Sequence, residues 1–168
     1  MLINTRLGDI ELELFPDKAP KTVAAFLSYV DSGFYKNSSF YRVLKTEDMP
    51  TDFNTGIIQG GIYQSKSDKI GKVLPIQHES TKLTGLSHLS GTVSFASLGA
   101  GTATTEFFIC IGDQLTLDAG ASGTADGQGY AAFGKVFKGM STVRKIQNQN
   151  SHGDRFDEKV DILNIERL

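Results

Sequence analysis

The histidines and their neighbours are the first residues whose types could support metal or acid–base chemistry. His78-Glu79 matches the start of a zinc-binding HExxH motif, but Lys82 stands where the second histidine belongs. Ser87 precedes His88, yet neighbours in sequence lack the geometry of a nucleophile and its base, and the chain has no nucleophile-elbow motif. We therefore expect the histidines to be solvated polar residues, and we expect no metal and no cofactor.

Glycine-rich and charged segments give no sign of a phosphate or nucleic-acid ligand. Gly99-Ala100-Gly101 begins like a phosphate-binding loop, but Thr104 replaces the third glycine and no helical pattern follows, so a flexible turn is the better interpretation. The 17 basic and 19 acidic residues give a net charge of -2 without a basic run. Nucleic acid is therefore not an expected partner.

The cysteine content and the apolar runs bear on the compartment. Cys110 is the only cysteine, so no internal disulfide can form, which is compatible with a reducing compartment. The segment after Met1 reaches its first acidic residue at Asp9 and lacks the apolar core of a signal peptide. No apolar run in the chain is long enough to cross a bilayer. These features favour a cytoplasmic protein that is not embedded in a membrane.

The elements that must position any site are mostly strands. Alternating residues on either side of Gly8-Asp9 predict a hairpin, with the turn at that dipeptide. Apolar spacing behind Pro20 predicts a helix that ends near Ser32, before Gly33. Short apolar runs separated by turn residues indicate a closed sheet. These runs lie at 40–44, 57–62, 91–96, 107–111 and 131–137, followed by a helix at 141–147 and a last strand at 159–165.

The chain shows no internal repeat and no linker that would divide it. At 168 residues it is long enough for one hydrophobic core, so we expect a single domain over 1–168 and a monomer. Two long loops, 46–55 and 118–128, are either functional segments or tolerated surface insertions, and the sequence leaves both interpretations open.

Several segments together resemble the cyclophilin family of peptidyl-prolyl cis-trans isomerases. They are Phe34 to Val43 with its Phe40-Tyr41-Arg42-Val43 end, Ile58-Gln59-Gly60-Gly61, Gly91 to Ala96 followed by Glu106 to Ile109, and Tyr130 to Val136 followed by Gly139-Met140. Their order and spacing extend the resemblance over nearly the whole chain, and Gly85-Leu86 is more similar to the bacterial members. The resemblance implies an eight-stranded antiparallel β-barrel capped by two α-helices, with the substrate groove on its outer face.

Arg42 matches the catalytic arginine of the family. Without the resemblance, an arginine in an apolar strand would be expected simply to point into solvent. Rotation about an X-Pro bond breaks no covalent bond, but it must overcome about 18–20 kcal/mol of amide resonance. A guanidinium that donates to the prolyl nitrogen favours the twisted state, in which the nitrogen lone pair is localised and can accept.

The resemblance also implies the residues that surround Arg42. By this matching Phe108 is the floor of the proline pocket, Leu117 is a wall, and Tyr130 lies at the rim. Gln59 orients the arginine, and Ala96 and Ser97 offer backbone contacts to the peptide. The expected ligands are proline-containing peptides and unfolded protein chains.

The chain departs from the family pattern around this pocket. Tyr41 replaces a histidine and is assigned a supporting role in the site. The segment between Val43 and Gln59 is longer than usual, so Gly56 aligns with the usual pocket phenylalanine and Ile57 with its neighbour. We expect Phe53, inside the insertion, to fold back and replace that ring.

Two further departures concern the charge and the shape of the pocket. Glu106 occupies a glutamine position and could either hold Arg42 or compete with substrate. Thr116 replaces a tryptophan or phenylalanine, and the altered pocket argues against cyclosporin binding. Two other functions stay open: a proline-peptide binding or chaperone-like module with weak turnover, and a lipocalin-type barrel, which would need a hollow interior.

Overall fold

A closed antiparallel β-barrel organises the chain, and the computed structural model describes residues 1–168. Eight strands pair in the order β1-β2-β7-β5-β6-β4-β3-β9, and β1 pairs with β9 to close the sheet. The two-residue β8 adds only to the edge of β9. The predicted eight-stranded barrel is confirmed. The strands are β1 Leu2–Thr5, β2 Gly8–Leu14, β3 Ser38–Lys45, β4 Gly56–Gly61, β5 Thr92–Phe95, β6 Phe107–Ile111, β7 Ala131–Lys138, β8 Ser151–His152 and β9 Arg155–Glu166.

The N-terminal hairpin turns earlier than its sequence suggests. Thr5 pairs with Gly8, so the two turn residues are Arg6 and Leu7, and the prediction of a turn at Gly8-Asp9 is wrong. The Thr5 hydroxyl explains this turn, because it donates to the carbonyl of Gly8 at 2.7 Å and accepts from the amide of Leu7 at 3.1 Å. A side chain that satisfies these backbone groups fixes the turn without a glycine inside it.

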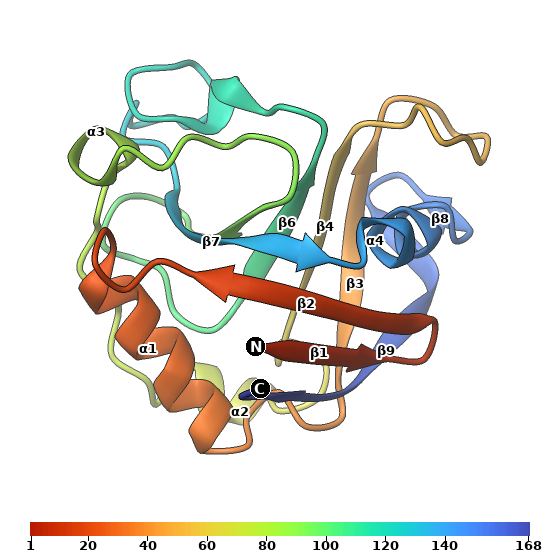
Figure 1. Ribbon diagram of the computed structural model, residues 1–168, viewed down its shortest axis with the longest axis horizontal. Helices are drawn as coiled ribbons and strands as arrows, with labels where there is room; N and C mark the ends of the chain where they lie inside the picture. Colours follow the sequence, from red (N-terminus) through yellow and green to blue (C-terminus); the bar gives the residue numbers. More distant parts are fainter.

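Two longer helices cover the barrel, as Figure 1 shows. Helix α1, Pro20–Asp31, begins at the proline and buries Val23, Phe26 and Val30, so the predicted helix is confirmed with an end one residue earlier. Helix α4, Met140–Gln147, buries Val143 and Ile146 and confirms the second predicted helix. Three short pieces were not predicted, namely α2 Ser67–Ile70, α3 Thr81–Thr84 and a 3-10 turn at Leu115–Leu117. No helix has the length and apolar character that a transmembrane span requires.

The barrel interior is filled by a cluster of 27 buried apolar residues. Phe26 of α1 lies among the rings of Tyr35, Phe95, Phe107 and Phe133, with ring centroids 5.0 to 6.2 Å away. The Tyr35 hydroxyl, fully buried, donates to the carbonyl of Thr105 at 2.7 Å, which satisfies its one polar group. The interior is therefore a packed core, and the lipocalin-type reading is wrong.

Candidate functional site

The two faces of β6 separate the core from the outer surface of the barrel. Alternate residues Phe107, Ile109 and Ile111 belong to the interior cluster, while Phe108 and Cys110 point outward and are also buried. Together with Ile57 of β4, these two form a second, small cluster on the outer face. The partly buried residues Ala96, Leu117 and Tyr130 pack against it. Sequence matching had assigned most of these residues to the proline pocket, and the fold brings them together.

A groove with a volume of about 1030 Å³ runs over this outer cluster. Ten of the eleven residues named from the sequence line it, and Phe53 is the exception. The ten are Tyr41, Arg42, Ile57, Gln59, Ala96, Ser97, Glu106, Phe108, Leu117 and Tyr130. Five of them lie on the strands β3, β4 and β6. The others lie in the connection between β5 and β6, in the 3-10 turn and just before β7, so the closed sheet brings them together.

A bulge in β3 turns two neighbouring side chains toward the groove. Phe40 and Val43 both belong to the interior cluster, although they are three residues apart and a regular strand would place them on opposite faces. The pairing of β3 shifts register between Phe40 and Arg42 against both β4 and β9. The extra residue lets Tyr41 and Arg42 both line the groove, which is a recognised use of β-bulges.

Arg42 is held on two sides of its guanidinium. Its Nε donates to Oδ2 of Asp154 at 2.9 Å, and its Nη1 donates to Oε1 of Gln59 at 3.0 Å. About a third of the side chain, 31%, is exposed. Two of the five N–H donors of the guanidinium are therefore engaged by the protein, and the others are free for a ligand in the groove.

Glu106 is bound into a hydrogen-bond network and does not contact Arg42 directly. Nε2 of Gln59 donates to the Tyr41 hydroxyl at 3.3 Å, and that hydroxyl donates to Oε1 of Glu106 at 2.9 Å. The same carboxylate accepts from the amides of Ile62 and Tyr63 and from the hydroxyl of Thr105 at 2.8 to 3.0 Å. Glu106 therefore supports Arg42 only through Tyr41 and Gln59, and its oxygens are already occupied.

Burial sets the protonation of this network. Loss of water around the Glu106 carboxyl raises its pKa, against the lowering effect of the hydrogen bonds it accepts. Burial also raises the pKa of Tyr41, with the nearby Glu106 charge acting in the same direction, so the phenol stays protonated and keeps donating. Tyr41 therefore acts as a fixed hydrogen-bond bridge and is unsuited to proton transfer.

Gly61 makes room for the carboxylate. Its φ is +145°, and a Cβ atom built there would lie 2.3 Å from Oε2 of Glu106. Such a contact is far inside van der Waals distance, so any side chain at this position would displace Glu106. The second glycine of the Gly60-Gly61 pair is thus explained by the approach of the Glu106 side chain.

Asp154 is a site residue that sequence reasoning missed. It lies in the turn between β8 and β9, 112 residues from Arg42, and no motif includes it. Its hydrogen bond with Arg42, more than the charge of that guanidinium and of Arg155, holds the pKa of the carboxyl below its usual range. It is ionised at neutral pH and keeps the guanidinium oriented.

A buried Asp-His-Ser arrangement lies behind the groove floor. His88 is fully buried, its Nδ1 is 2.7 Å from Oδ1 of Asp118, and its Nε2 is 3.0 Å from the Ser94 hydroxyl. The imidazole also stacks on Phe108, with ring centroids 5.9 Å apart and planes at 16°. The expectation that the histidines are solvated is wrong for His88, because the fold covers it completely. Burial lowers its pKa, against the opposing effect of Asp118.

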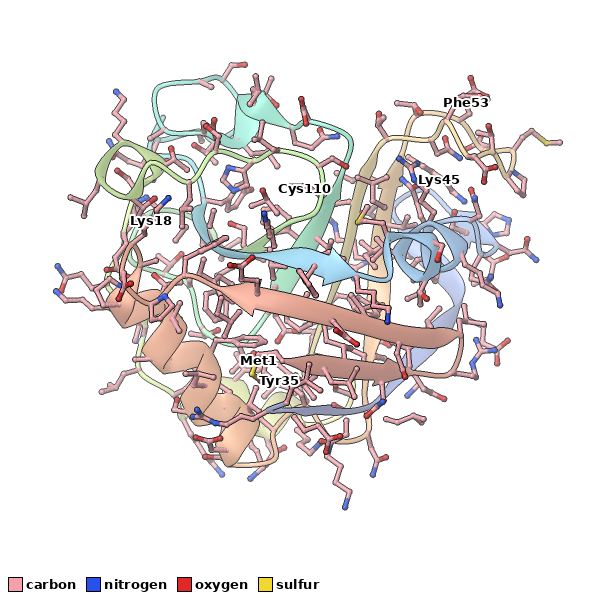
Figure 2. All side chains as sticks on the ribbon, viewed as in Figure 1. Met1, Lys18, Tyr35, Lys45, Phe53 and Cys110 are labelled. Atoms are coloured by element: carbon pink, nitrogen blue, oxygen red, sulfur yellow. The ribbon has the colours of Figure 1, made fainter.

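The middle of the long 46–55 loop is fastened to α4, while its two end residues, Thr46 and Thr55, line the groove. Arg144 of α4 donates to the carbonyls of Asp52 and Asn54 at 2.8 and 3.1 Å, and the buried Asn54 side chain donates to the carbonyl of Met49. Phe53 is 89% exposed. Figure 2 shows its side chain on the projecting loop. The expectation that Phe53 folds back over the pocket is wrong.

The Gly56 position cannot supply the missing ring either. Gly56 has a φ of +140°, and a Cβ atom there would lie 2.0 Å from the carbonyl oxygen of Leu44. The backbone at this point excludes any side chain. Gly56 and Thr116 both line the groove, so the two positions at which the family resemblance implies large rings are occupied by small residues here.

Comparison with known proteins agrees with this arrangement. Residues 1–167 match the family model described as Cyclophilin type peptidyl-prolyl cis-trans isomerase/CLD. The chain is 36% identical to a peptidyl-prolyl cis-trans isomerase of Acinetobacter baylyi over 147 residues, which are 87% of this chain and 70% of the relative. It is also 36% identical to peptidyl-prolyl cis-trans isomerase B of Escherichia coli, over 86% of this chain and 81% of the relative.

A solved structure shares the same fold. It is a cyclophilin type peptidyl-prolyl cis-trans isomerase of Cryptosporidium parvum, determined in the presence of the dipeptide Ala-Pro. The TM-score is 0.73 at 25% sequence identity, and the alignment covers 97% of this chain and 94% of the other. The likeness therefore includes all the strands that form the groove.

Proposed function

The chain belongs to the cyclophilin-type peptidyl-prolyl cis-trans isomerases, and from that premise we propose that Arg42 carries its catalysis. The observation that supports this assignment most directly is the double anchoring of the guanidinium by Gln59 and Asp154 in the groove that runs over the outer apolar cluster. A fixed donor costs little reorganisation when the transition state forms, which is where electrostatic catalysis gains most.

The chemistry follows from what the amide must do. In the planar ground state the prolyl nitrogen shares its lone pair with the carbonyl and accepts hydrogen bonds poorly, and this resonance gives a barrier of about 18–20 kcal/mol. In the twisted state the lone pair is localised on nitrogen. A free N–H of Arg42 donates to that lone pair, so the interaction is stronger in the transition state than in the ground state and the barrier falls.

One hydrogen bond does not account for the whole acceleration. Uncatalysed exchange takes about tens to hundreds of seconds. A millisecond turnover therefore requires about 6–7 kcal/mol, at 1.36 kcal/mol per tenfold. We assign the remainder to the apolar pocket, where Phe108 lies under the proline ring and Ile57, Leu117 and Tyr130 exclude water. A dry pocket strengthens every interaction that Arg42 makes inside it.

Backbone groups beside the pocket complete the proposed binding mode. The amide of Ala96 already donates to the carbonyl of Glu106 at 2.9 Å. Ala96 and Ser97 both line the groove, and we assign the Ala96 carbonyl and the Ser97 backbone to holding the substrate peptide. Main-chain hydrogen bonds of this kind position the peptide without depending on its side chains.

The test is an isomerisation assay on an Ala-Pro-containing peptide, by protease coupling or NMR exchange, that compares wild type with Arg42→Ala. We expect kcat/KM to fall by about 100-fold or more. Arg167→Ala is the matched control, because this exposed arginine pairs with Asp31 and does not line the groove. Full activity in Arg42→Ala would overturn the assignment, and peptide binding without acceleration in wild type would favour the binding-module alternative.

The wider role extends from the same site. We propose that the substrates are proline-containing segments of unfolded chains. We also propose that residues 1–168 act as one monomeric domain. Cyclosporin should bind weakly, because Gly56 and Thr116 offer no rings to the groove. The relative determined with Ala-Pro supports the choice of substrate. A single buried thiol and no internal disulfide fit a cytoplasmic location.

A further inference from the structure

Arg155 is a second guanidinium in the substrate groove, and the proposed mechanism does not use it. We propose that it forms an anion subsite that selects peptides with an Asp or Glu side chain close to the proline. This inference rests on the proposed function, because it names the substrates of the same groove. It concerns selectivity among proline-containing peptides and leaves the catalytic step to Arg42.

The sheet places the two arginines side by side. Arg155 is the first residue of β9, and its Cα is paired directly with that of Arg42 across the β3–β9 ladder. Its guanidinium lies over the ring of Tyr41, 5.7 Å from the centroid, which holds the side chain in place. The contact with the Tyr41 ring therefore orients the Arg155 guanidinium within the groove, where it can recognise a ligand.

The donors of Arg155 are not consumed by the protein. Its Nε is 3.7 Å from Oδ1 of Asp154, which is beyond hydrogen-bond length, and 53% of the side chain is exposed. The other oxygen of Asp154 is engaged by Arg42 at 2.9 Å. One carboxylate thus serves two guanidinium groups, and Arg155 keeps the fork of N–H donors that binds a carboxylate in bidentate fashion.

The charge of the groove favours an acidic ligand. The lining includes the cations Arg42, Lys45 and Arg155, whereas Glu106 is its only carboxylate. Glu106 is half-buried and already accepts four hydrogen bonds. The ammonium of Lys45 donates to backbone carbonyls near the end of α4, so no carboxylate compensates its charge. Even with Asp154 counted, cations outnumber carboxylates, although the chain as a whole carries a net charge of -2.

The spacing indicates where the acidic residue should lie. Cross-strand neighbours are about 5 Å apart, and an extended peptide advances about 3.3 Å per residue. With Arg42 at the prolyl nitrogen, Arg155 is therefore within reach of a side chain one or two positions from the proline. A carboxylate there would meet Arg155 without displacing the proline ring from Phe108.

The experiment measures kcat/KM for matched Ala-Pro peptides that carry Glu, Gln or Lys one or two positions on either side of the dipeptide. Wild type should prefer Glu over Gln by about 2- to 5-fold at one of these positions, as expected of one partly exposed ion pair, with a larger margin over Lys. The preference should fall in 0.5 M NaCl because salt screens the pair. Arg155→Gln should abolish the preference, Arg155→Lys should keep part of it, and Arg155→Glu should invert it.

Lys159→Gln is the matched control, since it removes the same charge from an exposed position on β9 that lies outside the groove. Its Glu-over-Gln ratio should equal that of wild type. A wild type without preference, a preference that survives Arg155→Gln, or equal losses in both variants would each overturn the subsite. None of these results would affect the Arg42 assignment, which is overturned only by the outcome of its own assay.

Discussion

The two faces of β6 place stability and function on opposite sides of one strand. The inner face, with Phe107, Ile109 and Ile111, belongs to the cluster of 27 buried residues that fills the barrel interior. The outer face contributes Phe108 and Cys110 to a cluster of only three buried residues. That outer cluster is backed by the polar His88 network and opens to the groove. The difference teaches that the inner apolar layer stabilises the barrel, whereas the outer layer is a small apolar patch at the groove, to which we assign the proline ring of the substrate.

Adjacent alanine substitutions on β6 should separate the two faces with the largest effect. Phe107→Ala should lower the free energy of unfolding by about 3–5 kcal/mol, because it leaves a cavity among the core rings. Phe108→Ala should cost less stability but lower kcat/KM by about tenfold or more, since the proline ring loses its floor. Urea unfolding and the isomerisation assay measure the pair, and equal stability losses with unchanged activity in Phe108→Ala would break the comparison.

The next effect concerns the polar edge of the outer face. Asp154→Asn should lower kcat by about tenfold with little change in KM, because Arg42 loses the charged acceptor that orients it. Asp154→Glu should restore part of the rate, and thermal stability should be unchanged because the side chain is 45% exposed. Asp157→Asn, also exposed but outside the groove, is the control. A uniform rise in KM at constant kcat would show that Asp154 does not position the catalyst.

The buried histidine behind the outer cluster should make stability depend on pH. The pKa of His88 lies below its usual 6.5 because of burial, so between the two values the unfolded chain binds more protons and the folded state gains stability as pH rises. The slope contributed by one group is at most about 1.4 kcal/mol per pH unit. His88→Gln should have a shallower slope than wild type between pH 5 and 6.5, measured by urea unfolding.

Two features isolate this contribution of His88. Glu106 has a raised pKa and changes stability in the opposite sense, but it does so in wild type and variant alike, so the difference in slope belongs to His88. His78→Gln, which removes a half-buried histidine outside the outer cluster, serves as the comparison variant. An identical slope in His88→Gln and wild type would show that His88 is not held neutral by the fold.

The smallest effect is expected where neither face of β6 is involved. Phe53→Ser should change the free energy of unfolding by less than about 0.5 kcal/mol and leave kcat/KM unchanged, because the ring is 89% exposed and outside the groove. Chemical denaturation and the peptide assay check both values. A loss of activity would mean that the Phe53 ring itself contacts the substrate, beyond the residues that line the groove.

Local patterns and family motifs predicted the parts of this molecule that are local in sequence. Pro20 and the apolar spacing behind it gave α1, and the motif around Arg42 gave the groove residues on β3, β4 and β6. The bulge that turns Tyr41 and Arg42 to the same side has no such signal, because it depends on register against two other strands. Register is set by the whole sheet and not by the residues of one strand.

The errors arose where long-range contacts override local character. Asp154 and Arg42 meet only because β9 returns to β3, and His88 is polar by type but is covered by Phe108, Tyr130 and Asp118. Phe53 is apolar by type, yet Arg144 fixes the middle of its loop, and the ring stays exposed outside the groove. In each case a partner distant in sequence decides burial, so hydropathy at the position itself gives the wrong answer.

The reactivity of the Cys110 thiol can report on how often the outer cluster opens to solvent. It is the only thiol in the chain, it is fully buried, and burial raises its pKa to about 12. Thiol reagents react with the thiolate, so the folded sheet shields this sulfur both by covering it and by keeping it protonated. The rate at which a disulfide reagent labels Cys110 therefore measures how often β6 opens. A peptide that binds on Phe108 should lower this labelling rate without contacting the sulfur.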